Sequence, residues 1–238
     1  MKNQYRFFVD NEDTSILKHQ LFNVLRLKVG DKISIIQKEK EYLCEITKEG
    51  YTIIEDITED RETPINLTLC VASLKKDKIE YVLQKATEVG VKSFILFNGD
   101  NSVKMMSRED FDKNLQRFKK IIREACEQSL RINEPGIEFF KTIKDINFKK
   151  YQNILITDST GEPFQKTVLD TNSSYLLVIG PEGGLSFEET NYLKSHGGEV
   201  ISYGKRLMRS ETASVVISAG IINYFENLVY DKTGKNYR

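Results

Sequence analysis

From residue 65 onward, short apolar runs alternate with segments of helical periodicity. Four runs have the length of buried strands: residues 66–72, 93–97, 153–157 and 175–179. Residues 76–90 instead carry apolar side chains at helical spacing and end at Gly90, and residues 108–130 form a longer helical pattern. Strands that alternate with helices predict an α/β domain with a parallel sheet covered by helices.

Residues 1–70 have a different pattern, dominated by short strands. Four segments are rich in strand-forming residues and separated by turns: residues 6–9, 32–36, 41–46 and 51–54. One helix is expected over residues 15–25. These elements predict a small β-barrel, and the acidic, proline-bearing residues 58–64 are the best candidate linker. We therefore predict two domains, residues 1–70 and 71–238.

Two glycine-bearing loops follow strands near the carboxyl end of the chain. The apolar run 175–179 ends at Gly180, and Ser186 lies three residues before Glu189, the spacing of a capping box that begins a helix. A short strand over residues 199–203 likewise ends at Gly204, before a closing apolar helix over residues 213–229.

The two loops could form one pocket. Open α/β sheets bind ligands at the carboxyl ends of their strands, and glycine lets the backbone approach a ligand closely. Taken alone, the pattern indicates a small-molecule site of unknown type, and ordinary strand-to-helix turns are the alternative.

Composition narrows the class of protein. The chain has 238 residues, 39% hydrophobic and 29% charged, which is typical of a globular protein with a core. Its 35 basic and 35 acidic residues argue against nonspecific coating of nucleic acid, although a local basic patch stays open. Cys44, Cys70 and Cys126 are far apart and favour neither a metal site nor disulfides. We expect no metal, no membrane-spanning segment, no signal peptide and a cytoplasmic location.

At this point the chain resembles a known family. The glycine loop 179–186 and residues 207–213 (Leu-Met-Arg-Ser-Glu-Thr-Ala) look like the ribosomal RNA small subunit methyltransferase E family, of the SPOUT class of knotted methyltransferases. Further matches occur in the family's order along nearly the whole chain: residues 6–9, His19, residues 24–26, residues 30–31, Lys78, residues 84–91, residues 124–129, Arg131 and Pro135. One departure is local. Family members usually carry an Arg shortly before the Val-Lys pair that corresponds to Val103 and Lys104. Here Asp100, Asn101 and Ser102 occupy that stretch.

The resemblance implies a fold and a reaction. It implies an N-terminal PUA-like RNA-binding barrel, a C-terminal domain with a deep trefoil knot, and a homodimer. The implied reaction is transfer of a methyl group from S-adenosyl-L-methionine to N3 of a uridine in small-subunit ribosomal RNA, within the assembled subunit. The implied cofactor-binding residues belong to three loops: Thr157, Asp158, Ile179, Gly180, Pro181, Glu182, Gly183, Gly184, Tyr203, Gly204, Leu207 and Met208.

Two residues are candidates for catalysis. Arg209 is expected to stabilise the charge that spreads over the uracil ring, and Glu211 is a weaker candidate for the base. A structural salt bridge of Arg209 with Glu182 or Glu211 is the alternative for Arg209, and capping of a helix start is the alternative for Glu211. We assign RNA contacts to five basic residues: Arg6, His19, Arg26, Arg123 and Arg131.

Three other functions stay open, of which a phosphate-binding α/β protein is the most distant. The chain could be another knotted RNA methyltransferase, acting on a ribose 2′-hydroxyl or on transfer RNA. It could also be an RNA-binding ribosome assembly factor that holds the cofactor without catalysis.

Overall fold

The structure is a computed structural model that describes residues 5–9, 15–164 and 173–233. It divides the chain into two units: residues 1–62 with 126–133, and residues 63–125 with 134–238. The boundary expected after residue 70 falls inside strand β5 (Asn66–Ala72), which pairs with strands of the second unit. The observed boundary lies within the predicted linker 58–64.

The first unit holds a four-stranded sheet. Its strands follow the order β1 (Arg6–Phe8), β2 (Lys32–Gln37), β3 (Lys40–Thr47) and β4 (Gly50–Asp56). β1 pairs in parallel with β2, and the other pairs are antiparallel. The predicted helix is present as α1 (Ser15–Lys18) continued by a π-helical segment, η1 (His19–Val24). Buried side chains from this helix and from the sheet, including Leu21, Ile33 and Ile35, form the core of the unit.

The second unit holds a parallel sheet of six strands, as the alternation of strands and helices predicted. The order is β10 (Gly198–Ser202), β8 (Asn153–Pro163), β9 (Ser174–Ile179), β5, β6 (Ser93–Phe97) and β7 (Gly136–Phe140). Sequence analysis did not predict β7. This strand lies at the edge of the sheet and only Phe139 in it is buried, so it lacks the continuous apolar run of a central strand.

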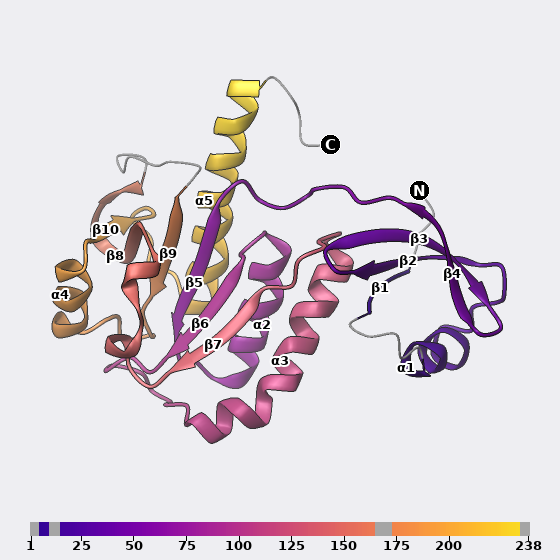
Figure 1. The fold of residues 1–238 in the computed structure, drawn as a ribbon. Coiled ribbons are helices and arrows are strands. Elements are labelled where there is room, and N and C mark those ends of the chain that lie inside the picture. Colours follow the sequence, from indigo (N-terminus) through magenta and orange to yellow (C-terminus); the bar gives the residue numbers. More distant parts are fainter. Residues whose placement is uncertain (1–4, 10–14, 165–172, 234–238) are drawn as a thin grey trace. The chain divides into compact units, whose positions relative to one another are not determined.

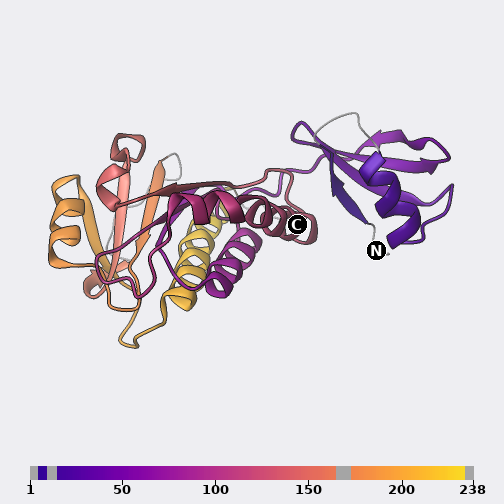
Figure 2. The ribbon, with the colours of Figure 1, turned by 90° about the horizontal axis from the view of Figure 1, so that it is seen from below.

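Helices cover both faces of this sheet. α2 (Lys76–Glu88) and α5 (Ser210–Thr233) lie side by side on one face, where Phe225 packs on Tyr175 of β9 (Figures 1 and 2). The opposite face is covered by α4 (Phe187–Ser195) and two short 3-10 helices, η2 (Ile143–Asp145) and η3 (Phe148–Lys150). The long helix α3 (Arg108–Gln128) connects β6 with β7.

α5 is long and apolar enough to cross a membrane by length and composition alone, which sequence analysis did not anticipate. In the structure this helix packs on α2, β5 and β9, and Ile217, Ile221 and Phe225 are buried there. Packing on the sheet accounts for part of its apolar character, since 33% of the apolar stretch is buried.

β8 is interrupted where it passes β10. Val200 pairs with Ile156, but the next residue, Ile201, pairs with Glu162, so residues 157–161 have no partner on β10. An irregularity of this kind interrupts the alternation of side chains between the two faces of the sheet and points some of them in a new direction. Here it brings residues 157–159 to the cavity described below.

Candidate functional site

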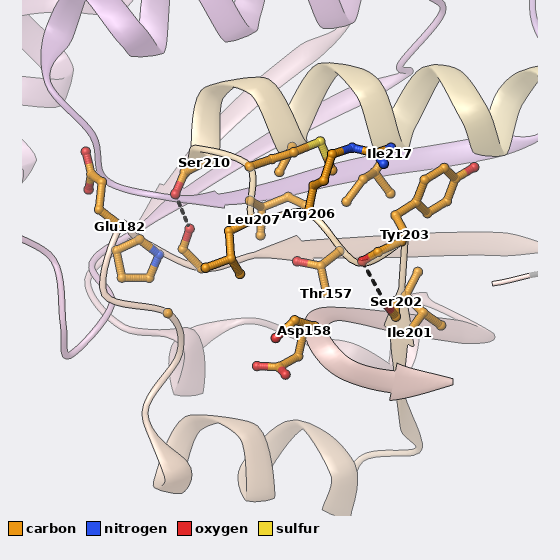
Figure 3. Close-up of a pocket in the computed structure, with 18 of the residues that line it drawn as sticks. Thr157, Asp158, Glu182, Ile201, Ser202, Tyr203, Arg206, Leu207, Ser210 and Ile217 are labelled. Atoms are coloured by element: carbon orange, nitrogen blue, oxygen red, sulfur yellow. Dashed lines mark hydrogen bonds between the residues drawn. The ribbon is translucent and has the colours of Figure 1, made fainter. Parts of the chain in front are cut away.

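A cavity of about 310 Å³ lies at the carboxyl ends of β9 and β10 and beside residues 157–159 in the middle of β8. All twelve residues expected to bind the cofactor line this cavity. Ser159 and Arg206, which belong to the loops expected to hold the cofactor, line it as well. Five further lining residues had not been assigned from the sequence: Ile201, Ser202, Ser210, Ala213 and Ile217. Figure 3 shows Thr157 and Asp158 on one side of this space and Leu207 and Arg206 on the other. The two glycine loops thus form one site, as predicted.

The three loops are held by hydrogen bonds to backbone groups. The Thr157 hydroxyl donates to the Val178 carbonyl over 3.0 Å, which joins the β8 irregularity to β9. The Ser210 hydroxyl, at the first residue of α5, donates to the Gly180 carbonyl over 2.8 Å (Figure 3). Gly184 and Gly204 adopt φ values of +74° and +106°, which side chains rarely tolerate. The glycines are therefore required by the loop conformations.

Lys78 connects three elements beside the cavity. From the first turn of α2, its Nζ lies 2.9 Å from Oε1 of Glu182 in the glycine loop and 3.4 Å from Oε2 of Glu211 in α5. The bond with Glu182 is the main reason why the pKa of Lys78 is raised, and it lowers the pKa of Glu182. Lys78 matched a family motif in the sequence, but no pattern showed that its ammonium faces two carboxylates.

The capping box predicted at the start of α4 is present. The Ser186 hydroxyl accepts from the Glu189 backbone N–H over 3.1 Å, and the Glu189 carboxylate accepts from the Ser186 N–H over 2.8 Å. Burial is the main reason why the pKa of Glu189 is raised, and the nearby Asp100 carboxylate adds to the shift. This cap fixes the point where the glycine loop enters the helix.

The two catalytic candidates lie next to the cavity lining in sequence but outside it. Arg209 is exposed and has no ion-pair partner among the described residues, so the alternative of a salt bridge with Glu182 or Glu211 is not observed. Glu211 lies in the first turn of α5 and is paired with Lys78, a contact that gives it a structural role.

The basic residues expected to contact RNA fall into two groups. Arg6 and Arg131 are buried, at 8% and 4% exposure, and each donates to a carboxylate within the first unit: Arg6 to Glu41, and Arg131 to Glu62. Arg6 also donates to the carbonyls of residues 126 and 127. Sequence analysis expected both to contact RNA, but the structure buries them in pairs with carboxylates inside this unit, where they hold it together.

The other three basic residues are more accessible. His19 and Arg26 are exposed on the first unit, and Arg26 has a positive φ of 55°. Arg123 pairs with Glu134 in the second unit. Arg123 and Arg131 do not share one helix face, because α3 ends at Gln128 and Leu130 turns the chain with a φ of +63°.

The small residues of α5 pack within the chain. The side chains of Ser214 and Ser218 are fully buried, and the Ser214 hydroxyl donates to the Ser210 carbonyl over 2.7 Å. Gly220 lies against the Tyr203 hydroxyl, which a β-carbon at this position would approach to 2.1 Å. These three positions therefore serve intrachain packing.

Comparison with known proteins identifies the family. A family described as RNA methyltransferase domain matches residues 61–222, and one described as RNA methyltransferase PUA domain matches residues 19–55. The chain belongs to the ribosomal RNA small subunit methyltransferase E family. It is 31% identical over 219 residues to the Bacillus subtilis protein of that name, covering 85% of this chain and 86% of the relative.

Other relatives agree with this assignment. A Borreliella burgdorferi protein named ribosomal RNA small subunit methyltransferase E 2 is 30% identical over 234 residues, covering 95% of this chain and 94% of its own. The fold matches the Neisseria gonorrhoeae ribosomal RNA small subunit methyltransferase E bound to S-adenosyl methionine. The TM-score is 0.82 at 23% identity, with 94% of this chain and 98% of that chain covered. A crystal structure of a hypothetical protein also has a TM-score of 0.82, at 28% identity, and covers 94% and 99% of the two chains.

Proposed function

We propose that this protein transfers a methyl group from S-adenosyl-L-methionine to N3 of a uridine in small-subunit ribosomal RNA. The observation that carries the proposal is the single cavity formed by the three loops, in a chain of this family. The relatives are named as methyltransferases of small-subunit ribosomal RNA, and the Neisseria protein of similar fold binds S-adenosyl methionine.

The cavity fits a nucleoside-containing cofactor. Its volume of about 310 Å³ lies at the lower end of the range for small-molecule sites, roughly 300–1,000 Å³. The glycine loops expose backbone N–H and C=O groups, and the Asp158 carboxylate can accept hydrogen bonds from ribose hydroxyls. The Leu207 side chain is 88% exposed, so a bound ligand that covers it would remove apolar surface from water.

The cofactor would supply an electrophilic methyl group on a sulfonium. The protein has to place uridine N3 about 3–3.5 Å from that carbon and in line with the bond that breaks. N3 carries a proton at neutral pH, and its loss leaves negative charge on O2 and O4 of the ring. We assign the stabilisation of that charge to the Arg209 guanidinium, because it is exposed and has no ion-pair partner among the described residues. Glu211 stays the candidate for the base, with its pairing to Lys78 as a competing structural role.

RNA contacts are proposed for the accessible basic residues His19, Arg26 and Arg123. Arg26 and Arg123 are suited to phosphate, because the guanidinium donates in a planar fork. The assembled small subunit, in the cytoplasm, is the proposed substrate.

We further propose the homodimer and the deep trefoil knot that the family resemblance implies. The chain has a mass of 27.5 kDa, so light scattering should give twice that value, about 55 kDa, and the monomer mass would contradict the dimer. The knot is supported by the path from β10, at the edge of the sheet, back to α5 on β9 and β5. An experimental structure whose chain path is unknotted would contradict it.

Calorimetry with S-adenosylmethionine tests the assignment of the cavity. Leu207→Ser should raise the Kd about fivefold or more without lowering the melting temperature, because an exposed side chain contributes only when ligand covers it. Val29→Ser, at a 55% exposed position of the first unit, is the matched control and should bind as wild type does. Equal affinity of all three proteins would exclude Leu207 from the site, and absence of binding by the wild type would reject the proposed function.

A further inference from the structure

The loop that follows β6 forms a clamp on the glycine loop. The Asn101 amide nitrogen lies 3.1 Å from the Gly184 carbonyl and 3.5 Å from the Gly183 carbonyl. Both neighbours are acceptors, so the nitrogen of the amide, and not its oxygen, must face them. Residues separated by about eighty positions in the chain are thereby joined at the rim of the cavity.

A second set of contacts comes from the neighbouring residue. The Asp100 carboxylate accepts from the Ser186 hydroxyl over 2.6 Å, and the Asp100 backbone N–H donates to Glu189 over 3.1 Å. Ser186 and Glu189 form the capping box of α4. Asp100 therefore holds the far end of the glycine loop, where the loop passes into the helix.

The two loops also pack closely. A β-carbon at Gly183 would lie 3.0 Å from the β-carbon of Asn101, and one at Gly99 would lie 3.2 Å from the Pro181 ring. The clamp thus fixes the glycine loop both by hydrogen bonds and by contact with the backbone.

We propose that Asn101 and Asp100 are positioning residues that preorganise the glycine loop for the cofactor. A loop with three glycines loses much conformational entropy when a ligand orders it. Contacts that order the loop beforehand reduce this cost and lower the Kd. Neither residue lines the cavity, so both act on the ligand through the loop. The inference rests on the proposed function, since it assumes that the cavity binds S-adenosylmethionine.

Calorimetry with S-adenosylmethionine and thermal unfolding, measured on the full chain, test the clamp. Asn101→Ala should raise the Kd about five- to tenfold, the size expected for a lost pair of hydrogen bonds. Asn101→Asp should raise it further, because it has the same shape but places a carboxylate against two carbonyls. Both melting temperatures should stay within about 2 °C of the wild type, because Asn101 is exposed.

The control is Asn114→Ala, which also removes an amide that donates to a backbone carbonyl, here that of Asp110 over 2.7 Å. It should bind S-adenosylmethionine as the wild type does. If the wild type binds and the Asn101 variants bind equally well, the clamp has no positioning role and the inference is wrong. If the melting temperatures fall together with affinity, the residue is structural, which also overturns it. Failure of the wild type to bind would instead reject the proposed function.

Discussion

Arg209 is the residue on which the proposed chemistry depends most. Its guanidinium is exposed and free of ion pairs among the described residues, although acidic side chains lie at Glu182 and Glu211 nearby in the fold. Lys78 pairs with both carboxylates, and the described residues show no ion pair between either of them and Arg209.

Replacing Arg209 by Ala should lower turnover by about two orders of magnitude, the usual effect of removing a group that stabilises charge in the transition state. The Kd for S-adenosylmethionine should not change. Lys205→Ala, in the same loop and also exposed, is the control for loss of a positive charge. Turnover of Arg209→Ala close to that of the wild type would remove this residue from the mechanism.

The Arg6–Glu41 pair contributes stability to the first unit. The two side chains are each 5% exposed, and their nitrogen and oxygen atoms lie 2.8 Å apart. Burial alone would raise the pKa of Glu41, but the bonds from Arg6 outweigh it and the pKa is lowered. A carboxyl with a lowered pKa stabilises the folded state above its unfolded pKa, near 4.5, and loses that contribution as pH falls through the folded pKa.

Glu41→Gln should therefore reduce the free energy of unfolding by about 3–5 kcal/mol at neutral pH, because it leaves a buried guanidinium without its counter-charge. The difference from the wild type should shrink as pH falls below 4.5, where this carboxyl becomes protonated first in the unfolded chain and, at lower pH, in the folded protein. Denaturant unfolding at several pH values measures this difference in the free energy of unfolding. Glu39→Gln, at an exposed position, is the control. A difference that does not depend on pH would contradict the ionic role of the pair.

Sequence position alone could not separate the structural arginines from the accessible ones. Arg6 and Arg26 both match the family pattern, yet Arg6 is buried against Glu41 and Arg26 is exposed. The burial of Arg6 depends on partners that lie 35 and about 120 residues away in the sequence, and a local sequence pattern does not show such partners.

At the scale of elements, the loops of the site were predictable where the chain itself marks them. An apolar strand followed by glycines predicted the loop after β9, and the Ser186–Glu189 spacing predicted the start of α4. The β8 irregularity was not predictable from periodicity, because it is defined by a register shift against β10. The edge strand β7 was missed for a different reason: it is only partly buried, so its sequence has no continuous apolar run.

Lys78 is the contact between elements that most needs a test. Lys78→Met removes the ammonium that joins α2 to the glycine loop and to α5, so the Kd for S-adenosylmethionine should rise about three- to fivefold, the range of a partly exposed ion pair. Lys76→Met, whose partner Glu80 lies on the same helix, is the matched control and should bind normally. An unchanged Kd for Lys78→Met would show that the glycine loop does not need this anchor.

At the scale of the whole molecule, the two units have separate cores and different sheet types. The family matches follow the same division, with a PUA domain over residues 19–55 and a methyltransferase domain over residues 61–222. Composition predicted a globular protein but did not indicate the long apolar helix α5, one face of which packs on α2, β5 and β9. The parallel sheet and its helices followed from periodicity, whereas the closeness of Lys78, Asn101 and Ser210 to the glycine loop required the fold.

The central claim is that the cavity serves methyl transfer to a uridine of small-subunit ribosomal RNA. The most direct measurement incubates the protein with methyl-labelled S-adenosylmethionine and small subunits that lack the modification, then identifies the labelled nucleoside by mass spectrometry. The account predicts N3-methyluridine, formed by the wild type and strongly reduced with Arg209→Ala. A 2′-O-methylated nucleoside, labelling of transfer RNA alone, or cofactor binding without any transfer would contradict it, and each would favour one of the alternative functions.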